Sequence, residues 1–165
     1  ISESISSLEN LVYLNLWDNH ISGFIPRELG ELSKLEFLGL GENNLMGHIP
    51  KELGNARSLK SIGLFENELT GPIPDEITIL PELTYLGLFN NQLEGSVTDQ
   101  LLKKGKMSYL RLNNNQFSDI DHDTMCRSGY NWENSIYFDV SKNKFEDPLP
   151  VCFHNSTFHK IYSSY

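Results

Sequence analysis

The sequence lacks the basic charge that binds polyanions and the long apolar run that spans a membrane. Lys and Arg number 13 against 22 Asp and Glu, which gives a formal net charge of −9, and so acidic a chain does not attract nucleic acid or anionic lipid. No apolar run is long enough to span a bilayer, and residues 1–10 lack the basic end and apolar core of a secretion signal. Apolar residues still make up 39% of the chain, which favours a folded protein over a disordered one.

Motifs of catalysis and metal binding are also missing. The five histidines do not have H-E-x-x-H spacing, and no G-x-S-x-G, phosphate-binding loop or kinase motif occurs. Asp119, Asp121 and Asp123 match the first three ligand positions of a calcium loop, but Thr124 and Tyr130 stand where that loop has Gly and Glu. We therefore expect no catalytic residue, no metal site and no cofactor.

A repeat of 24 residues organises the chain. The pattern L-x-x-L-x-L-x-x-N occurs five times in phase, and the copies close at Asn19, Asn43, Asn67, Asn91 and Asn115. A sixth, less regular copy closes at Asn143, 28 residues after the fifth, so four residues are inserted before it. The period-two alternation around L-x-L predicts a strand with one buried face. No single repeat can bury its leucines alone, so successive turns must stack.

The second half of the repeat identifies its type. Residues 21–26, 45–50 and 69–74 read ISGFIP, LMGHIP and LTGPIP. With the L/N pattern, this L-x-G-x-I-P tail resembles the plant-type subclass of the leucine-rich repeat family, found in ectodomains of receptor-like kinases and receptor-like proteins and in polygalacturonase-inhibiting proteins. The resemblance implies an α/β solenoid, a right-handed superhelix with a parallel β-sheet on its concave face, and a role in extracellular recognition.

The resemblance also assigns roles to the residues that follow each strand. It implies that the closing Asn is buried at a corner, where its amide bonds backbone groups of adjacent turns. The proline of each tail marks the convex side, where we expect that a regular sheet cannot continue. We expect the tail glycines to adopt backbone angles that other residues resist; they are Gly23, Gly47, Gly71 and Gly95.

The solenoid is expected to span residues 1–153, as a half repeat, five full repeats and the final irregular repeat, and residues 154–165 to form a C-terminal tail or cap. Ile1 lies 24 residues before its equivalent Ile25, so the chain opens halfway through a repeat. Because terminal repeats need polar caps, we expect that further N-terminal repeats precede it or that a partner covers this end. A short cap formed by residues 1–7 is the alternative.

Cys126 and Cys152 are the only two cysteines, and by register both lie on the convex side of adjacent turns. We expect a disulfide between them, worth about 3 kcal/mol, in an oxidising compartment; two buried thiols in a reducing compartment are the alternative. Asn155 begins the only N-glycosylation sequon. We accordingly expect an extracellular, secretory or organelle-lumen location.

The outward positions of the strands carry the candidate binding residues. These positions are 13, 15 and 17 plus multiples of 24, and they form two aromatic columns on either side of a glycine lane, with an acidic edge beyond. The candidate ligand- or partner-binding residues are Tyr13, Trp17, Phe37, Phe65, Tyr85, Phe89, Tyr109, Arg111, Asp18, Glu42 and Glu66. Cross-strand stacking that only stabilises the sheet is the alternative, but outward aromatic patches of this extent usually mark an interface.

The interpretation is a non-catalytic module, part of a receptor-like or secreted recognition protein, that binds a protein, peptide or glycan through its concave aromatic face. The glycine lane is expected to lower the floor of the groove, and the acidic edge to favour a neutral or basic partner. Peptide-binding members of the family often carry paired arginines for a free carboxylate, whereas Arg111 stands alone. A subunit docked permanently in a larger assembly is the alternative, and an enzyme inhibitor is the third. We expect neither nucleic-acid binding nor membrane insertion by this segment.

Overall fold

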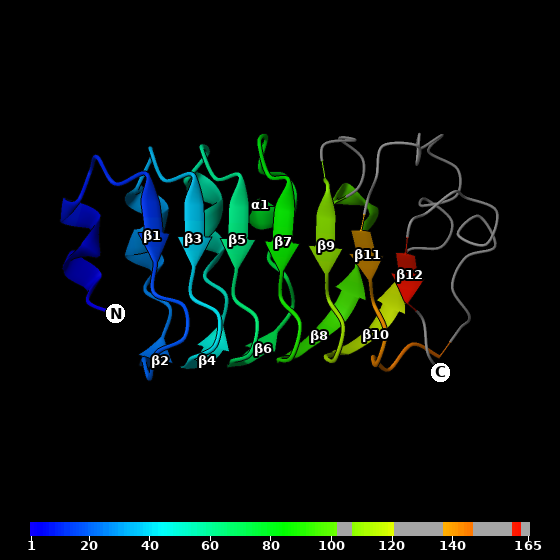
Figure 1. Cartoon of the computed structure of the whole chain (residues 1–165). Coiled ribbons are helices and arrows are strands. Elements are labelled where there is room, and N and C mark those ends of the chain that lie inside the picture. The colour runs from blue at the N-terminus through cyan, green and yellow to red at the C-terminus, as the bar shows by residue number, and fades with distance from the viewer. Residues whose placement is uncertain (102–106, 121–136, 147–159, 163–165) are drawn as a thin grey trace.

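The computed structural model of the chain describes residues 1–101, 107–120, 137–146 and 160–162. These residues form a solenoid. Each of the first five repeats adds a strand to a front sheet, turns a corner, adds a strand to a second sheet and returns along the back, mostly through a short helix (Figure 1). The predicted fold class, an α/β solenoid with parallel strands, is therefore confirmed.

The front sheet has seven parallel strands that stand side by side in chain order (Figure 1). Equivalent residues of successive repeats pair directly, as Tyr13 does with Phe37 and Leu14 with Leu38. Each sequence column therefore becomes a row of neighbouring side chains across the sheet. The strands are β1 (Tyr13–Asn15), β3 (Phe37–Gly39), β5 (Ser61–Gly63), β7 (Tyr85–Gly87), β9 (Tyr109–Arg111), β11 (Tyr137–Asp139) and β12 (Lys160–Tyr162).

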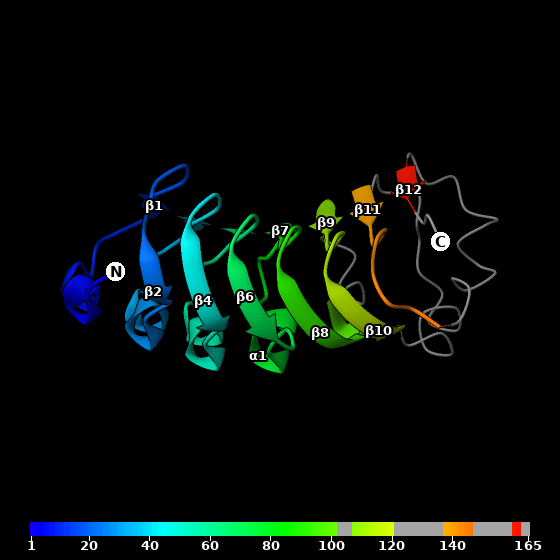
Figure 2. The same ribbon diagram turned by 90° about the horizontal axis from the view of Figure 1, so that it is seen from below.

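The second sheet has five parallel strands and is seen from below in Figure 2. Its strands are β2 (Ser22–Phe24), β4 (Asn44–His48), β6 (Glu68–Gly71), β8 (Gln92–Val97) and β10 (Gln116–Ile120). The prediction that no regular sheet continues on this side was wrong. Pro26, Pro50 and Pro74 follow the strands and cap the helices behind them. The prolines thus end this sheet and do not prevent it from forming.

Short helices form the back of the solenoid behind the two sheets (Figure 2). The helix η1 precedes β1 as η2 precedes β3, and it packs against η2. Within the described ranges, no helix is long and apolar enough to cross a membrane. The helices are η1 (Glu3–Ser7), η2 (Arg27–Glu31), η3 (Lys51–Asn55), α1 (Asp75–Thr78) and η4 (Asp99–Leu101).

The core is a column of leucines between the sheets and the helices. Leu38, Leu64 and Leu45 are fully buried, and each such side chain contributes about 1.5–3 kcal/mol of transfer free energy. Leu38 and Leu64 belong to the L-x-L pattern, whereas Leu45 belongs to the tail. The same core therefore lies beneath both sheets.

The closing asparagine ties neighbouring turns together, as the resemblance implies. Asn67 donates from Nδ2 to the carbonyls of Leu40, Leu64 and Phe65 at 3.0, 3.2 and 3.1 Å, and its Oδ1 accepts the N–H of Leu45 at 2.9 Å. These bonds satisfy backbone groups at the bend between the sheets, where no ladder partner exists. The arrangement recurs at Asn43, Asn91, Asn115 and Asn143.

Candidate recognition surface

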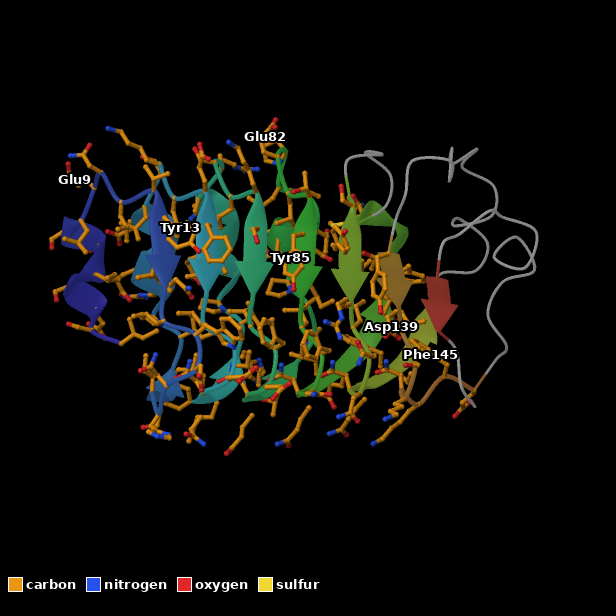
Figure 3. All side chains as sticks on the ribbon, viewed as in Figure 1. Glu9, Tyr13, Glu82, Tyr85, Asp139 and Phe145 are labelled. Carbon is orange, nitrogen blue, oxygen red and sulfur yellow. The ribbon has the colours of Figure 1, made fainter. Side chains whose placement is uncertain are left out.

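The outward side chains of the front sheet form a surface that we call the aromatic face. Side chains alternate along each strand, so the leucine in the middle of the strand points to the core and the residues on either side of it point outward. Tyr13 and Tyr85 both lie on the front of this sheet in Figure 3. The residues of the aromatic face are Tyr13, Trp17, Phe37, Phe65, Tyr85, Phe89, Tyr109, Arg111 and Tyr137.

The first row of the aromatic face lies at the start of the front-sheet strands. Tyr13 stacks on Phe37 with ring centroids 4.2 Å apart and planes 8° from parallel. Tyr109 has ring centroids 6.1 Å from Tyr85 and 6.0 Å from Tyr137, in tilted arrangements. Tyr13 and Tyr109 remain 59% and 51% exposed, so these contacts leave much of both rings in solvent.

The second aromatic row lies where the strands end. Phe65 stacks on Phe89 at 4.6 Å, and Trp17 meets Phe65 edge to face at 6.1 Å. The guanidinium carbon of Arg111 lies 3.8 Å from the centroid of the Phe89 ring, a cation–π contact. Phe89 is buried under these neighbours, whereas Trp17 is 50% exposed. Of this row, Trp17 therefore offers the most accessible ring.

The glycine lane between the rows has a different role from the expected open floor. A Cβ on Gly39 would lie 2.9 Å from the Phe37 ring, and one on Gly87 would lie 2.7 Å from the Tyr85 hydroxyl. At these two positions the expectation was wrong, because the chain's own rings lie over the glycines. At Gly63 an added Cβ would make only ordinary contacts, the nearest with the edge of the Phe65 ring at 3.4 Å, so the lane is less covered there.

A cavity of about 380 Å³ opens around this part of the lane. Aromatic side chains form its walls, and its polar atoms come from neutral groups, including the amide of Asn15 and the hydroxyl of Ser61. The Oδ1 of Asn15 accepts the N–H of Trp17 at 3.2 Å, which leaves the Nδ2 group available. The lining residues are Tyr13, Asn15, Trp17, Phe37, Gly39, Ser61, Gly63, Phe65 and Tyr85.

The charge of Arg111 is held close to the sheet. Within the described part of the chain, its buried Nε has no hydrogen-bond partner. Asp139 is buried opposite Arg111 on β11, but its Oδ1 accepts from the N–H and Oγ of Ser141 at 3.0 and 2.8 Å. Burial raises the pKa of the Tyr85 hydroxyl, and the positive charge of Arg111 partly opposes that shift. Neither the burial of Asp139 nor its bonds could be predicted from the repeat pattern.

The predicted acidic edge lies at the corner between the two sheets. Asp18 and Glu66 are exposed and Glu42 is half-buried, and all three have left-handed backbone angles, with φ of 55°, 53° and 51°. Asn90 and Asn114 occupy the same position in the next repeats, where Asn114 Nδ2 donates to Asn90 Oδ1 at 2.9 Å. This backbone requirement was not predicted, although the asparagines signal it because Asn tolerates positive φ.

Three other predicted positions, Cys126, Cys152 and Asn155, lie outside the described residues. The disulfide and the glycosylation site therefore stay predictions. In the part of the chain that the structure describes, no group of three or more His, Cys, Asp or Glu side chains could hold a metal ion.

The repeat geometry agrees with comparisons to known proteins. The family model described as Leucine Rich Repeat matches residues 10–32 and 34–56. The chain is a leucine-rich repeat protein of the plant type. No match was found among curated protein sequences.

Solved structures similar to this leucine-rich repeat chain include plant receptors and a plant ice-binding protein. The Arabidopsis receptor kinase HAESA, in complex with the peptide hormone IDA and the co-receptor SERK1, has a TM-score of 0.87 and 29% identity over all of this chain and 27% of its own. A TDR receptor has a TM-score of 0.85 and 33% identity over 98% of this chain and 27% of its own. PEPR1-AtPEP1 has a TM-score of 0.78 and 38% identity over 87% of this chain and 20% of its own. The chain thus spans about a quarter or less of these three receptor chains.

Proposed function

We propose that this chain is a non-catalytic recognition module that binds an extended polypeptide across its aromatic face. The observation that carries the proposal is the exposure of Tyr13, Trp17 and Tyr109, which are 59%, 50% and 51% accessible on one sheet surface. Rings that served only to stabilise the sheet would gain by burying their faces against neighbours. Exposed aromatic side chains around a cavity are instead the usual anchors of a protein interface.

The similar structures support a polypeptide ligand. HAESA was solved with a peptide hormone and a co-receptor, and RGFR1 is described as a plant peptide hormone receptor in complex with RGF2. By this analogy the module belongs to a receptor-like protein outside the cell. That location would suit a Cys126–Cys152 disulfide and a glycan on Asn155.

The acidic corner supplies the expected charge preference of the partner. Asp18 and Glu66 are exposed beside the second aromatic row, and Asp18 directly follows the exposed Trp17. A partner that crosses the aromatic face toward this corner would meet negative charge, so a neutral or basic polypeptide is favoured. The effect should weaken with salt because these carboxylates are in solvent.

A permanently docked structural subunit is the second candidate. It is favoured by Phe24 and Met46, which are 70% and 41% exposed on the second sheet and pair in register on β2 and β4. A subunit that buries both surfaces would aggregate when isolated. Size-exclusion chromatography of the chain alone separates the two candidates, because a recognition module should elute as a monomer.

The direct test uses random linear peptides displayed on phage. Peptides are selected on the wild-type chain, and their affinity is then measured for a Tyr13→Ser/Trp17→Ser variant and for a Phe24→Ser control. The double variant removes two of the three most exposed rings on the described part of the aromatic face, whereas the control removes an even more exposed ring from the second sheet. We expect the double variant to lose roughly tenfold or more in affinity and the control to bind normally.

Thermal unfolding of all three proteins shows whether they remain folded. Since Tyr13 and Trp17 are exposed, the double variant should unfold within a few degrees of the wild type. Normal peptide binding by a folded double variant would rule out the proposed function.

A further inference from the structure

The first row of the aromatic face is interrupted at one strand. Rings that occupy neighbouring strands contact each other, as Tyr13 does Phe37 at 4.2 Å and Tyr85 does Tyr109 at 6.1 Å. Between these two pairs, β5 carries Ser61 in register with Phe37 on one side and Tyr85 on the other. We call this position, bounded by Phe37 and Tyr85, the Ser61 gap.

The width of the Ser61 gap matches one ring. Adjacent strands lie about 4.8 Å apart, so Phe37 and Tyr85 originate roughly 9.6 Å from each other. A ring placed midway would lie about 4.8 Å from each, within the range in which aromatic rings attract. The stacked pairs on this sheet have similar separations, 4.2 and 4.6 Å.

The space above Ser61 is open. The cavity of about 380 Å³ is lined by Phe37 and Tyr85, with Ser61 and Gly63 between them. Gly63 has no side chain, and an added Cβ would be 3.4 Å or more from every neighbour. Among the described residues, only the edge of the Phe65 ring approaches this part of the lane, whereas Gly39 and Gly87 lie directly under Phe37 and Tyr85.

The lining of the cavity disfavours a charged ligand group. No ionisable acid or base lines the cavity apart from the tyrosine hydroxyls of Tyr13 and Tyr85. Arg111 lies two strands from Ser61, on β9, with its guanidinium over Phe89. A phosphate, sulfate or carboxylate in the gap would lose hydration without gaining a cation.

We propose that the Ser61 gap binds an uncharged aromatic side chain, Phe, Tyr or Trp, of the partner polypeptide. The proposal rests on the proposed function and adds the residue class that anchors the ligand. The inserted ring stacks between Phe37 and Tyr85 and completes the row across the sheet. A polar edge, such as a tyrosine hydroxyl or an indole N–H, finds a partner in Ser61 or Asn15.

Charge complementarity adds a second feature of the ligand. Glu42 and Glu66 lie at the corner that follows strands β3 and β5. Glu66 lies three residues beyond Gly63, or about 10 Å along an extended chain. A Lys or Arg within about three residues of the aromatic side chain can therefore reach this corner.

The test fills the gap by substituting Ser61 with an aromatic residue. Ser61→Tyr should leave the midpoint of thermal unfolding unchanged or raise it, because the new ring stacks on both neighbours. It should weaken the binding of peptides selected on the wild type roughly tenfold or more, because their aromatic residue is excluded. Ser22→Tyr is the matched control, since Ser22 is exposed on the second sheet, and it should bind normally.

A double-mutant cycle identifies the ligand residue that occupies the gap. The recurrent aromatic residue of a selected peptide is replaced by Ser, and both peptides are measured against wild type and Ser61→Tyr. The two losses should not add, because each removes the same contact. If Ser61→Tyr does not fold, Tyr85→Leu removes one wall and should lower affinity for the aromatic peptide alone.

The outcomes separate this inference from the proposed function. Peptides without a recurrent aromatic residue, or fully additive losses, would overturn the Ser61 gap as a binding site, even while Tyr13→Ser/Trp17→Ser still abolishes binding. If no peptide distinguishes the wild type from that double variant, the proposed function itself is lost. Dimerisation of the wild type that Ser61→Tyr abolishes would mean that a second copy of the chain fills the gap, and would also overturn the inference.

Discussion

The two sheets of this solenoid rest on the same leucine core but present different outer faces. Each of the first five repeats contributes one strand to each sheet, and the pairing is parallel in both. The front sheet carries rings and glycines, whereas exposed positions of the second sheet are mostly polar, for example Asn44, Glu68, Gln92 and Glu94. The second sheet shows that this fold needs no aromatic outer face. The aromatic residues of the front sheet therefore require another reason, and ligand recognition supplies one.

The corner asparagines join the two faces, and their loss should have the largest effect on stability. Asn67→Ala leaves four hydrogen bonds unmade and should lower the free energy of unfolding by about 3 kcal/mol. The control is Asn19→Ala, because exposed Asn19 donates only to the carbonyls of Leu16 and Trp17; it should cost about 1 kcal/mol. Urea unfolding measures both. Equal losses would mean that bonds between turns do not hold the sheets together.

The glycines of the two sheets should respond differently to alanine. Gly95 in β8 has φ of +86° and its nearest new contact would be 3.6 Å away, so Gly95→Ala should cost about 1 kcal/mol through backbone strain alone. Gly63 in β5 has no positive φ, so Gly63→Ala should change stability by less than about 0.5 kcal/mol. Thermal unfolding compares the two. A larger loss at Gly63 would show that the front glycines are structural as well.

A smaller gain is expected at the corner itself. Glu66 has φ of +53°, and Asn adopts this conformation more readily than Glu. Glu66→Asn should therefore raise the free energy of unfolding by roughly 0.5 kcal/mol. Glu68→Asn, two residues later in strand β6 and without a positive φ, should give no gain, because Asn is disfavoured in strands. A gain at both positions would point to reduced negative charge as the cause.

The smallest effect concerns the aromatic face at alkaline pH. Burial raises the pKa of Tyr85 in the folded protein, so the unfolded chain releases this proton first, near pH 10. The associated stability is present below that pH and is lost as the pH rises through the folded-state value. Tyr85→Phe should therefore lose less stability than the wild type between neutral pH and pH of about 11. Parallel alkaline unfolding curves would contradict this assignment.

The repeat allowed the front sheet and its core to be predicted, because one spacing fixes which side chains point inward. The second sheet was missed although Leu45, Gly47 and Ile49 also alternate, because the proline after them was taken as incompatible with a sheet. The positions of the rings depend on side-chain torsions that a column of letters does not contain. For this reason Phe89 was expected on the surface, whereas the structure buries it between Phe65 and Arg111.

The glycine lane shows the same limit. Its residues were predicted to form one open floor, but the conformations of neighbouring aromatic side chains determine where that floor is covered. Phe37 leans over Gly39, whereas only the edge of Phe65 approaches Gly63. Ser61 was not among the predicted binding residues, because its role depends on the rings of Phe37 and Tyr85 on the neighbouring strands.

Mapping where a bound peptide lies tests the central claim most directly. Amide and aromatic NMR signals of the chain are followed while a peptide selected on the wild type is added. The account predicts that the largest shifts fall on the front sheet, at Tyr13, Trp17, Phe37 and Tyr85, with little change at Phe24 and Met46 of the second sheet. Shifts concentrated at Phe24 and Met46 would contradict it and would place recognition on the second sheet.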